Sequence, residues 1–223
     1  MSPYYDEGGI TIYHARCEDV LPDIDPATVD LLLTDPPYGI NLDTDSRGRS
    51  SKAKGPGINH ARVAGDNEPF DPAPLLTYGR CILFGANHYA SRLPDSAGWL
   101  FWDKTTQNDM GHAAFKSEGE FAWTNVINRA ICWRHIWHGG FRQSERGFHV
   151  HPTQKPTKLM RWLVGRFTKP GDLVLDPYMG SGPVAQACHE LGRRYIGVEV
   201  VEDYCKVAVS RLRQQTFDFG GIA

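Results

Sequence analysis

The sequence predicts an α/β fold built on a doubly wound, mostly parallel sheet. Short apolar runs recur along the chain, and they are continuous rather than alternating, which is typical of strands buried on both faces. Helical patterns lie between or after these runs, as expected when strands alternate with helices in a parallel sheet. The expected strands cover residues 9–13, 29–35, 80–86, 98–104, 172–178 and 194–200.

Three segments carry helical patterns. Residues 156–167 begin with Pro156 in a first-turn position, and their apolar residues recur at helical spacing. Residues 182–192 end at a glycine, which is a C-cap signal. Residues 202–215 are amphipathic. These segments supply the helices that the predicted sheet needs.

Two segments do not follow this alternation, and we place them within a single domain of residues 1–223. Residues 41–66 are rich in Gly, Ser, Lys and Arg, which predicts a long mobile basic loop. A loop of this length in a compact domain is usually functional or disordered. Residues 105–150 mix aromatic, strand-like pieces with Gly and basic residues. We expect a small insertion there that reads a target.

The composition points to a cytoplasmic protein. The 5 cysteines are scattered without a CxxC pair, which argues against a zinc ribbon or a disulfide framework and fits a reducing compartment. No signal region and no apolar run long enough to cross a bilayer is present, so we expect no membrane partner.

Charge is distributed unevenly along the chain. The formal net charge is only −2, but residues 125–170 contain one acid, Glu145, among many cations. The cations are Arg129, Arg134, Arg142, Arg146, Lys155, Lys158, Arg161, Arg166 and Lys169. The interleaved aromatic residues are Trp133, Trp137, Phe141 and Phe148. This pattern favours a nucleic-acid surface, and a solvated face balanced by acids elsewhere is the alternative.

A glycine-rich turn follows the strand at 172–178. Gly180 and Gly182 let the backbone approach a ligand, and the helix behind them offers free N–H groups. Glu199 ends the next strand, where an acid can accept hydrogen bonds from both ribose hydroxyls of a nucleoside. The three-glycine dinucleotide fingerprint is not met, so a nicotinamide enzyme is disfavoured. A plain strand-to-helix turn beside an unrelated acid is the alternative.

Three motifs together resemble the DNA amino-methyltransferases that use S-adenosylmethionine. They are DPPY at 35–38, HPTQKP at 151–156 and DPYMGSG at 176–182. DPPY precedes the glycine loop, and this permuted order resembles the β group of that family. The resemblance spans roughly residues 10–214 and implies a class I, Rossmann-like methyltransferase fold. DPPY alone could be a strand-to-loop turn, since Asp-Pro is a common turn starter.

The resemblance also assigns a cofactor site. It implies contacts from the glycine loop and the following strand, and contacts over the methionine end from the HPTQKP segment. The implied residues are Asp176, Pro177, Tyr178, Gly180, Ser181, Gly182, Glu199, Thr153 and Lys155. Tyr178 replaces the phenylalanine usual in the family. The Gly-Asp pair that reaches the cofactor adenine in the family is replaced by Ala15-Arg16, so Glu18, Asp19 or another acceptor takes that contact.

The chemistry of DPPY follows from the poor nucleophilicity of an exocyclic amino group. The Asp35 carboxylate and the Pro36 carbonyl can accept both N–H bonds and localise the nitrogen lone pair. Pro36 and Pro37 fix φ and remove N–H donors, so the turn is rigid. Tyr38 offers a face on which a flipped base can stack. Catalysis is then mostly by positioning, and no strong general base is required.

The acceptor base and the partners follow from the same resemblance. An Asp in the first motif position accompanies mostly adenine N6 activity in the family, and a Ser accompanies mostly cytosine N4 activity. Asp35 therefore favours adenine in DNA. The alternatives are a cytosine-N4 enzyme, a protein-glutamine or RNA methyltransferase, and a non-catalytic DNA-binding relative. A homodimer is one option for the assembly.

Further candidates concern DNA and metals. We expect DNA contacts from basic residues of the long loop and of the insertion, namely Arg47, Arg49, Lys52, Lys54, Arg129, Arg134, Arg142 and Arg146. His135 and His138 are too few for a metal site, so no metal is expected.

Overall fold

The computed structural model describes residues 1–41, 64–105, 117–138, 141–144 and 154–215. Within these residues, nine strands form one sheet in the order β1-β2-β11-β10-β3-β4-β6-β5-β7. Its strands are β1 (Tyr5–Glu7), β2 (Ile10–His14), β3 (Leu31–Thr34), β4 (Cys81–Phe84), β5 (Trp99–Asp103), β6 (Gly119–Thr124), β7 (Ala130–Arg134), β10 (Leu173–Asp176) and β11 (Arg194–Glu199). A separate two-stranded sheet pairs β8 (Trp137–His138) with β9 (Phe141–Arg142).

Strand direction confirms a mostly parallel α/β sheet. β2, β11, β10, β3 and β4 are parallel neighbours. β6 is antiparallel to both β4 and β5, and β7 is parallel to β5. The edge strand β1, which the sequence pattern did not predict, is antiparallel to β2. All six strands expected from the apolar runs are present.

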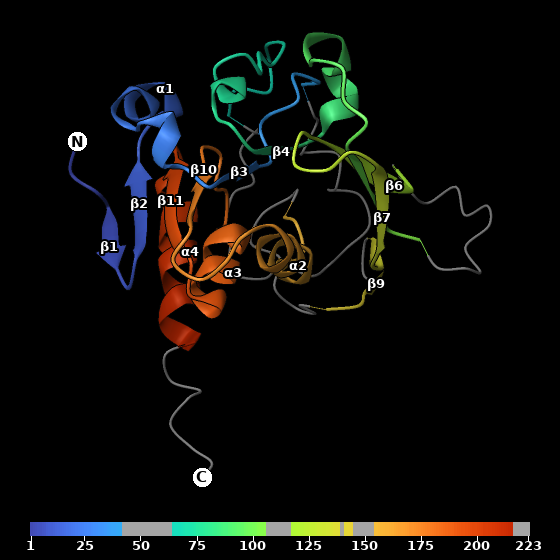
Figure 1. The fold of residues 1–223 in the computed structure, drawn as a ribbon. Helices are drawn as coiled ribbons and strands as arrows, with labels where there is room; N and C mark the ends of the chain where they lie inside the picture. Colours follow the sequence, from blue (N-terminus) through green and yellow to red (C-terminus); the bar gives the residue numbers. More distant parts are fainter. Residues whose placement is uncertain (42–63, 106–116, 139–140, 145–153, 216–223) are drawn as a thin grey trace.

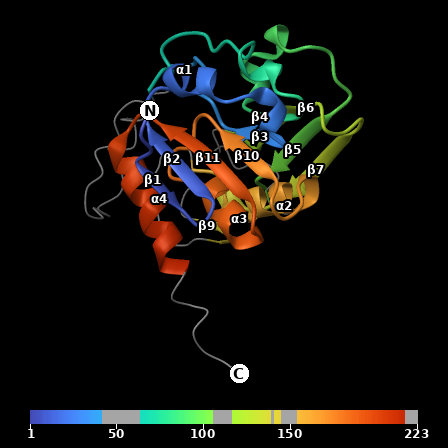
Figure 2. The same ribbon diagram turned by 60° about the vertical axis from the view of Figure 1, so that its left-hand side comes forward.

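The three predicted helices cover one face of this sheet. They are α2 (Thr157–Phe167), α3 (Pro183–Leu191) and α4 (Glu202–Gln215), and Figures 1 and 2 show them on the same side of the strands. Pro156 is the N-cap of α2 rather than a residue of its first turn. Gly192 caps α3 in the left-handed conformation, as its position predicted. None of the described helices is long and apolar enough to cross a membrane.

The opposite face is covered by short helical turns. These are α1 (Cys17–Val20) and 3₁₀ turns at Leu21–Asp23, Pro26–Thr28, Leu75–Thr77, Ala86–His88 and Ala90–Arg92. Leu31 and Leu33 of β3 pack in the helix-side core, whereas Leu32 between them packs on the other side with Leu75 and Tyr89. A continuous apolar strand is therefore buried on both faces, as its composition required.

Part of the segment expected to be an insertion, residues 105–150, belongs to the main sheet. Residues 119–124 and 130–134 form β6 and β7 of the main sheet, and β6 lies between β4 and β5. The aromatic residues of these strands belong to the sheet and suit a pleated, half-buried surface. Residues 106–116, 139–140 and 145–150 of this segment lie outside the described residues, as do residues 42–63 of the expected basic loop.

The parallel strands bring distant parts of the sequence to one edge of the sheet. β3, β10 and β11 are neighbours that run in the same direction, so their carboxyl ends meet there. Asp35 follows β3, Asp176 ends β10 and Glu199 ends β11. In open α/β sheets, ligands bind beyond this edge. The permuted order of the motifs in sequence therefore does not separate them in space.

A buried polar cluster ties these three strands together. The Thr34 hydroxyl donates to Asp176 Oδ1 at 2.6 Å, and the Tyr195 hydroxyl donates to Asp176 Oδ2 at 3.3 Å. Burial raises the pKa of Asp176 to about 7, although the bonds from Thr34, the Tyr178 N–H and Tyr195 oppose this rise. Charging this carboxyl in the folded state is therefore unfavourable.

The cluster predicts a pH-dependent effect of Asp176→Asn. The pKa of the folded state, about 7, lies above the ordinary value of 3.8, so stability in the wild type falls as pH rises between these values. The amide cannot ionise, so the variant gains stability relative to the wild type by up to about 3 kcal/mol between pH 5 and pH 8. Urea denaturation at both pH values measures the difference. An equal difference at both pH values would contradict the buried, titrating carboxyl.

Candidate active site

The Asp35 carboxylate is bonded through both of its oxygens. The Tyr38 hydroxyl donates to Oδ1 at 2.5 Å, and Lys155 Nζ donates to Oδ2 at 2.5 Å. Lys155 Nζ also lies 3.2 Å from the Tyr38 hydroxyl oxygen. Two members of the DPPY motif and the lysine of HPTQKP thus form one cluster. The prediction placed Lys155 at the cofactor, and the structure places its ammonium group on the proposed catalytic carboxylate.

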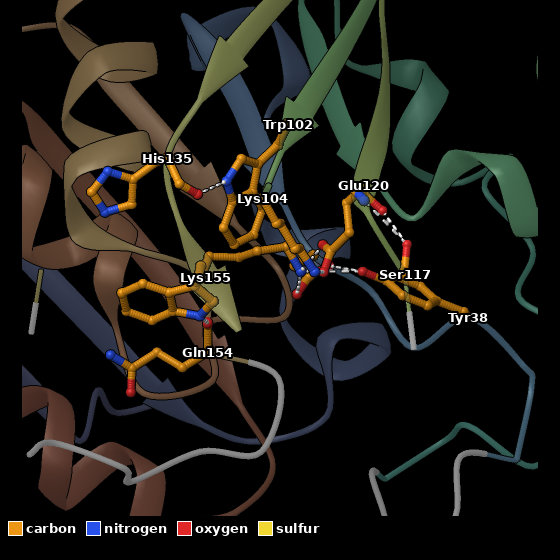
Figure 3. Close-up of polar contacts among 11 residues, drawn as sticks. Tyr38, Trp102, Lys104, Ser117, Glu120, His135, Gln154 and Lys155 are labelled. Atoms are coloured by element: carbon orange, nitrogen blue, oxygen red, sulfur yellow. Dashed lines mark hydrogen bonds and ion pairs between the residues drawn. The ribbon is translucent and has the colours of Figure 1, made fainter. Parts of the chain in front are cut away.

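Lys155 lies between two carboxylates. Its side chain is 3% exposed, and Nζ is 2.9 Å from Glu120 Oε2 as well as bonded to Asp35. Lys104 pairs with the other oxygen of Glu120. Figure 3 shows Lys104 and Lys155 converging on Glu120, with Tyr38 beside them. Two cations and two carboxylates therefore balance in the cluster, which we call the ion cluster: Asp35, Glu120, Lys104 and Lys155.

The charges of the ion cluster are mutually dependent. Burial raises the pKa of Asp35, and Lys155 opposes this rise while Glu120 adds to it. Burial also acts to raise the pKa of Glu120, but Lys155 and Lys104 outweigh it and lower that pKa to about 2. Burial acts to lower the pKa of Lys155, but the two carboxylates outweigh it, and the net shift is upward. Glu120 and Lys155 are therefore charged across the physiological range.

The ring of Tyr38 has two close neighbours in the turn after β4. It stacks on His88 with 5.1 Å between ring centroids and 13° between planes. Gly85, which follows β4 with φ of +68°, lies so close that a Cβ there would overlap the Tyr38 ring. Burial and the neighbouring Asp35 raise the pKa of Tyr38 well above its ordinary value, so the hydroxyl stays protonated as a donor. A base that stacks on the His88 side must displace the imidazole.

Asp66 fixes the chain where it leaves the motif. Its Oδ1 accepts hydrogen bonds from the N–H groups of Tyr38 at 3.0 Å, Gly39 at 2.9 Å and Ile40 at 3.3 Å. Gly39 has φ of +73°, and a Cβ there would overlap the backbone of Glu68 and Pro69. The end of the segment predicted to be a mobile loop is therefore bonded to the motif.

The glycine loop and Glu199 form a second cradle at the same edge. Gly180 N–H donates to Glu199 Oε2 at 2.8 Å, and Val201 N–H donates to Oε1 at 2.8 Å. Gly182 has φ of +78°, and a Cβ there would overlap Ala208 of α4. The carboxylate accepts backbone N–H groups from Gly180, Val200 and Val201, and the remaining acceptor capacity of its two oxygens can serve ligand hydroxyls. These residues fit the ribose of a nucleoside cofactor.

The other residues predicted at the cofactor have different surroundings. Asp176 lies in the core between strands, and Pro177 and Ser181 are also buried, so these side chains support the loop. The ring of Tyr178 is half-buried and packs on Phe70 with 5.8 Å between centroids. Thr153 lies outside the described residues.

Ala15-Arg16 stands where the resemblance led us to expect a Gly-Asp pair that contacts the cofactor adenine. Arg16 is exposed and pairs with Glu18 at 3.4 Å, so this acid is engaged at the surface. Cys17 lies beside Tyr178 at the start of α1, where their side chains share a hydrogen bond.

Two of the predicted DNA contacts can be placed. Arg129 is exposed in the turn before β7. Arg134 on β7 is exposed too, but its Nε donates to Asp103 Oδ2 at 2.7 Å. Arg142 lies on β9, and Arg47, Arg49, Lys52, Lys54 and Arg146 lie outside the described residues.

Two of the aromatic residues expected at a nucleic-acid surface, Trp133 and Trp137, have partners within the protein instead. Trp137 is buried, and its Nε1 donates to the Gln154 carbonyl at 3.1 Å. Trp133 stacks on Trp162 of α2 with 6.2 Å between centroids. Trp137 is therefore in the core and Trp133 is half-buried, and both indoles have aromatic or backbone partners within the protein.

His135 is bonded within the protein. It is buried, and its Nε2 lies 2.9 Å from Ser144 Oγ. In the part of the chain that the structure describes, no group of three His, Cys, Asp or Glu residues could hold a metal ion.

Three residues of the site were missed from sequence. Glu120 and Lys104 complete the ion cluster, and Asp66 holds the exit of the motif. The one sequence feature that could have marked Glu120 is its position as an acid beside the aromatic residues of β6. Asp66 had no signal, because its partners lie far away in sequence.

Comparison with known proteins agrees with this geometry. The family model N6_N4_Mtase, described as DNA methylase, matches residues 99–210. The type II methyltransferase M2.DpnII of Streptococcus pneumoniae is 37% identical over 90 residues, which cover 40% of this chain and 34% of that protein. The type II methyltransferase M2.LlaDCHI of Lactococcus lactis subsp. cremoris is 24% identical over 95% of this chain and 92% of its own length.

Solved structures share the fold. The M1.HpyAVI–SAM complex is 25% identical with a TM-score of 0.54, covering 91% of this chain and 99% of that one. PvuII DNA methyltransferase, which is cytosine-N4-specific, is 13% identical with a TM-score of 0.65, covering 99% and 90% respectively, and it shows the fold alone. Since the family model spans half of the sequence, the chain belongs to the N6_N4_Mtase family of DNA methylases.

Proposed function

We propose that this chain transfers a methyl group from S-adenosylmethionine to the N6 amino group of a flipped adenine in DNA. The observation that carries the proposal is the Asp35 carboxylate, which lies after β3 at the sheet edge that also holds the glycine loop and Glu199. An acceptor for an amino group and a cradle for a nucleoside cofactor thus share one edge. Membership of the DNA methylase family supports the same reaction.

S-adenosylmethionine, when bound, supplies an electrophilic methyl group on a sulfonium. Glu199 would accept hydrogen bonds from the ribose hydroxyls, and the loop at Gly180 and Gly182 would let the backbone approach the cofactor. One of the similar solved structures is a complex of M1.HpyAVI with SAM, which supports this choice of cofactor.

The residues around Asp35 would prepare the amino group. One N–H of the base would donate to Asp35 and the other to the Pro36 carbonyl, which localises the nitrogen lone pair. Asp35 and Pro36 would thereby hold the nitrogen for attack on the methyl group that S-adenosylmethionine would supply. The methylated nitrogen carries a positive charge until it loses one proton, and Asp35 is placed to accept it. Catalysis comes chiefly from positioning in this arrangement.

The motif favours adenine over cytosine, because Asp rather than Ser occupies its first position. The family model covers both N6 and N4 enzymes, so a cytosine-N4 enzyme is the second candidate. A protein-glutamine or RNA methyltransferase is a further alternative, and the motif order and the Asp at position 35 speak against it. A non-catalytic DNA-binding relative is another, and the intact DPPY, GSG and Glu199 speak against it.

Asp35→Ala is expected to lower methyl transfer to DNA by at least about 100-fold, since it removes the acceptor of the amino N–H. Cofactor binding should be nearly unchanged, because the glycine loop and Glu199 are untouched. Labelled methyl incorporation and calorimetry measure the two effects. The matched control is Asp95→Ala, at an exposed site. Near-normal transfer by the Asp35 variant would refute the mechanism.

Two substitutions of Tyr38 distinguish the effect of its stacking face from that of its hydroxyl hydrogen bond. Tyr38→Ala removes the stacking face and should cost about 1–3 kcal/mol in kcat/KM for DNA. Tyr38→Phe keeps the ring and removes only the hydroxyl on Asp35 Oδ1, so its kcat/KM should exceed that of the alanine variant at least about fivefold. Steady-state kinetics with one duplex substrate provides the comparison. Equal losses in both variants would show that the ring is not a platform.

The acceptor base can be identified directly. A plasmid library is methylated and digested to nucleosides, and mass spectrometry distinguishes N6-methyladenine from N4-methylcytosine. Sequencing of single molecules then gives the sequence context. We expect N6-methyladenine. N4-methylcytosine alone would overturn the adenine assignment while retaining amino-methyl transfer, and methylation of RNA or protein but not DNA would support the other substrate classes.

A further inference from the structure

Lys155 has a role in the structure that differs from the one its motif suggested. We propose that Lys155, held by Glu120, is the positioning residue of Asp35: it anchors Oδ2 and leaves Oδ1 as the oxygen that accepts the N–H of the base. This inference rests on the proposed function and assigns roles to two residues outside DPPY.

Three oxygen atoms of the protein surround the ammonium group of Lys155. An ammonium group has three N–H bonds. Asp35 Oδ2 lies 2.5 Å, Glu120 Oε2 2.9 Å and the Tyr38 hydroxyl 3.2 Å from Nζ. Asp35 and Tyr38 accept hydrogen bonds from Nζ, and Glu120 forms an ion pair with it. The side chain is also 3% exposed, so contact with a cofactor would require it to give up one of these three contacts.

The two oxygens of Asp35 are held unequally. Oδ2 is bonded to a buried cation that is itself fixed by a second carboxylate. Oδ1 is bonded to the Tyr38 hydroxyl, a neutral donor whose ring stacks on the exposed His88. Exchanging a neutral donor for the N–H of a base is easier than breaking a buried ion pair. The incoming amino group therefore replaces Tyr38 at Oδ1, and Lys155 keeps the carboxylate oriented.

Lys155 and Glu120 act on Asp35 in opposite directions. Removal of the cation leaves two carboxylates in one buried site, which raises the pKa of Asp35 further. Removal of the Glu120 charge relieves this repulsion and lowers the pKa of Asp35. The other titratable groups that act on these carboxylates or adjoin the motif are Lys104, Tyr38, Tyr89, Asp176 and His88.

The opposite directions in which Lys155 and Glu120 shift the pKa of Asp35 define the test. The pH dependence of kcat/KM for DNA is measured at saturating S-adenosylmethionine for the wild type, Lys155→Met, Glu120→Gln and the double variant. Asp35 must be ionised to accept the N–H, so activity falls as pH drops through its pKa. We expect the acidic limb of the pH profile to move to higher pH by at least about one unit in Lys155→Met. At pH values below the limb this lowers kcat/KM about tenfold. The limb should move to lower pH in Glu120→Gln. In the double variant it should lie between the limbs of the two single variants.

The matched control is Lys206→Met, exposed on α4 and outside the site, which should keep the limb of the wild type. Calorimetry with S-adenosylmethionine should give the same Kd for Lys155→Met and the wild type. A Kd at least tenfold weaker would assign Lys155 to the cofactor and overturn the inference.

The outcomes separate this inference from the proposed function. A wild type that methylates DNA, with coincident limbs in all variants, would overturn the role of Lys155 and leave the function standing. A wild type that methylates no DNA would overturn both. Should Lys155→Met not fold, Glu120→Gln decides alone, because a downward shift supports the inference and an unshifted limb refutes it.

Discussion

The ammonium group of Lys155 lies between the carboxylates of Asp35 and Glu120 in the interior of the protein. Charges taken out of water are costly unless each has a partner, and removal of one partner leaves an uncompensated charge. Lys104 supplies the second cation, so the ion cluster is neutral as a whole. Four side chains from the exit of β3, the β5–β6 region and the approach to α2 are thereby bound into one unit. The position of the DPPY motif depends on this unit.

The sheet supplies the other constraint. Parallel β3, β10 and β11 end at the same edge, so a motif from the start of the chain and a loop from its end face the same space. Thr34 and Tyr195 bind Asp176 beneath that edge, and Asp66 holds the backbone that leaves Tyr38. The DPPY turn is thus fixed at three places: at its entry by β3, through the side chains of Asp35 and Tyr38, and at its exit by Asp66. Rigid support of this kind is what catalysis by positioning requires.

Local pattern was sufficient for most of the fold. Leu31–Leu33 and Leu173–Leu175 are continuous apolar runs, and only a strand buried on both faces suits them. Pro156 and Gly192 marked the ends of helices through their own backbone preferences. At β6 and β7 the strand-like character was recognised, but these strands were assigned to an insertion, whereas they belong to the main sheet. A half-buried strand near the edge of a mixed sheet has a weaker signature than a central parallel strand.

Only those residues of the site that belong to a sequence motif could be predicted from the sequence. DPPY, the glycine loop and Glu199 could be located because each carries its chemistry within a few neighbouring residues. Glu120 and Asp66 could not, since their function depends on partners that are distant in sequence and adjacent only after folding. For the same reason the lysine of HPTQKP was assigned to the cofactor, whereas its bonds in the folded chain go to Asp35 and Glu120.

A crystal structure of the chain with S-adenosylhomocysteine and a duplex carrying its methylation site tests the central claim most directly. The measured quantity is the distance from the exocyclic nitrogen of the flipped base to Asp35 Oδ1. We predict a hydrogen bond of about 2.7–3.2 Å there, a second to the Pro36 carbonyl, and Lys155 still bonded to Oδ2. A flipped base held elsewhere, with Tyr38 and Lys155 both still bonded to Asp35, would contradict the assignment of this carboxylate as the catalytic acceptor.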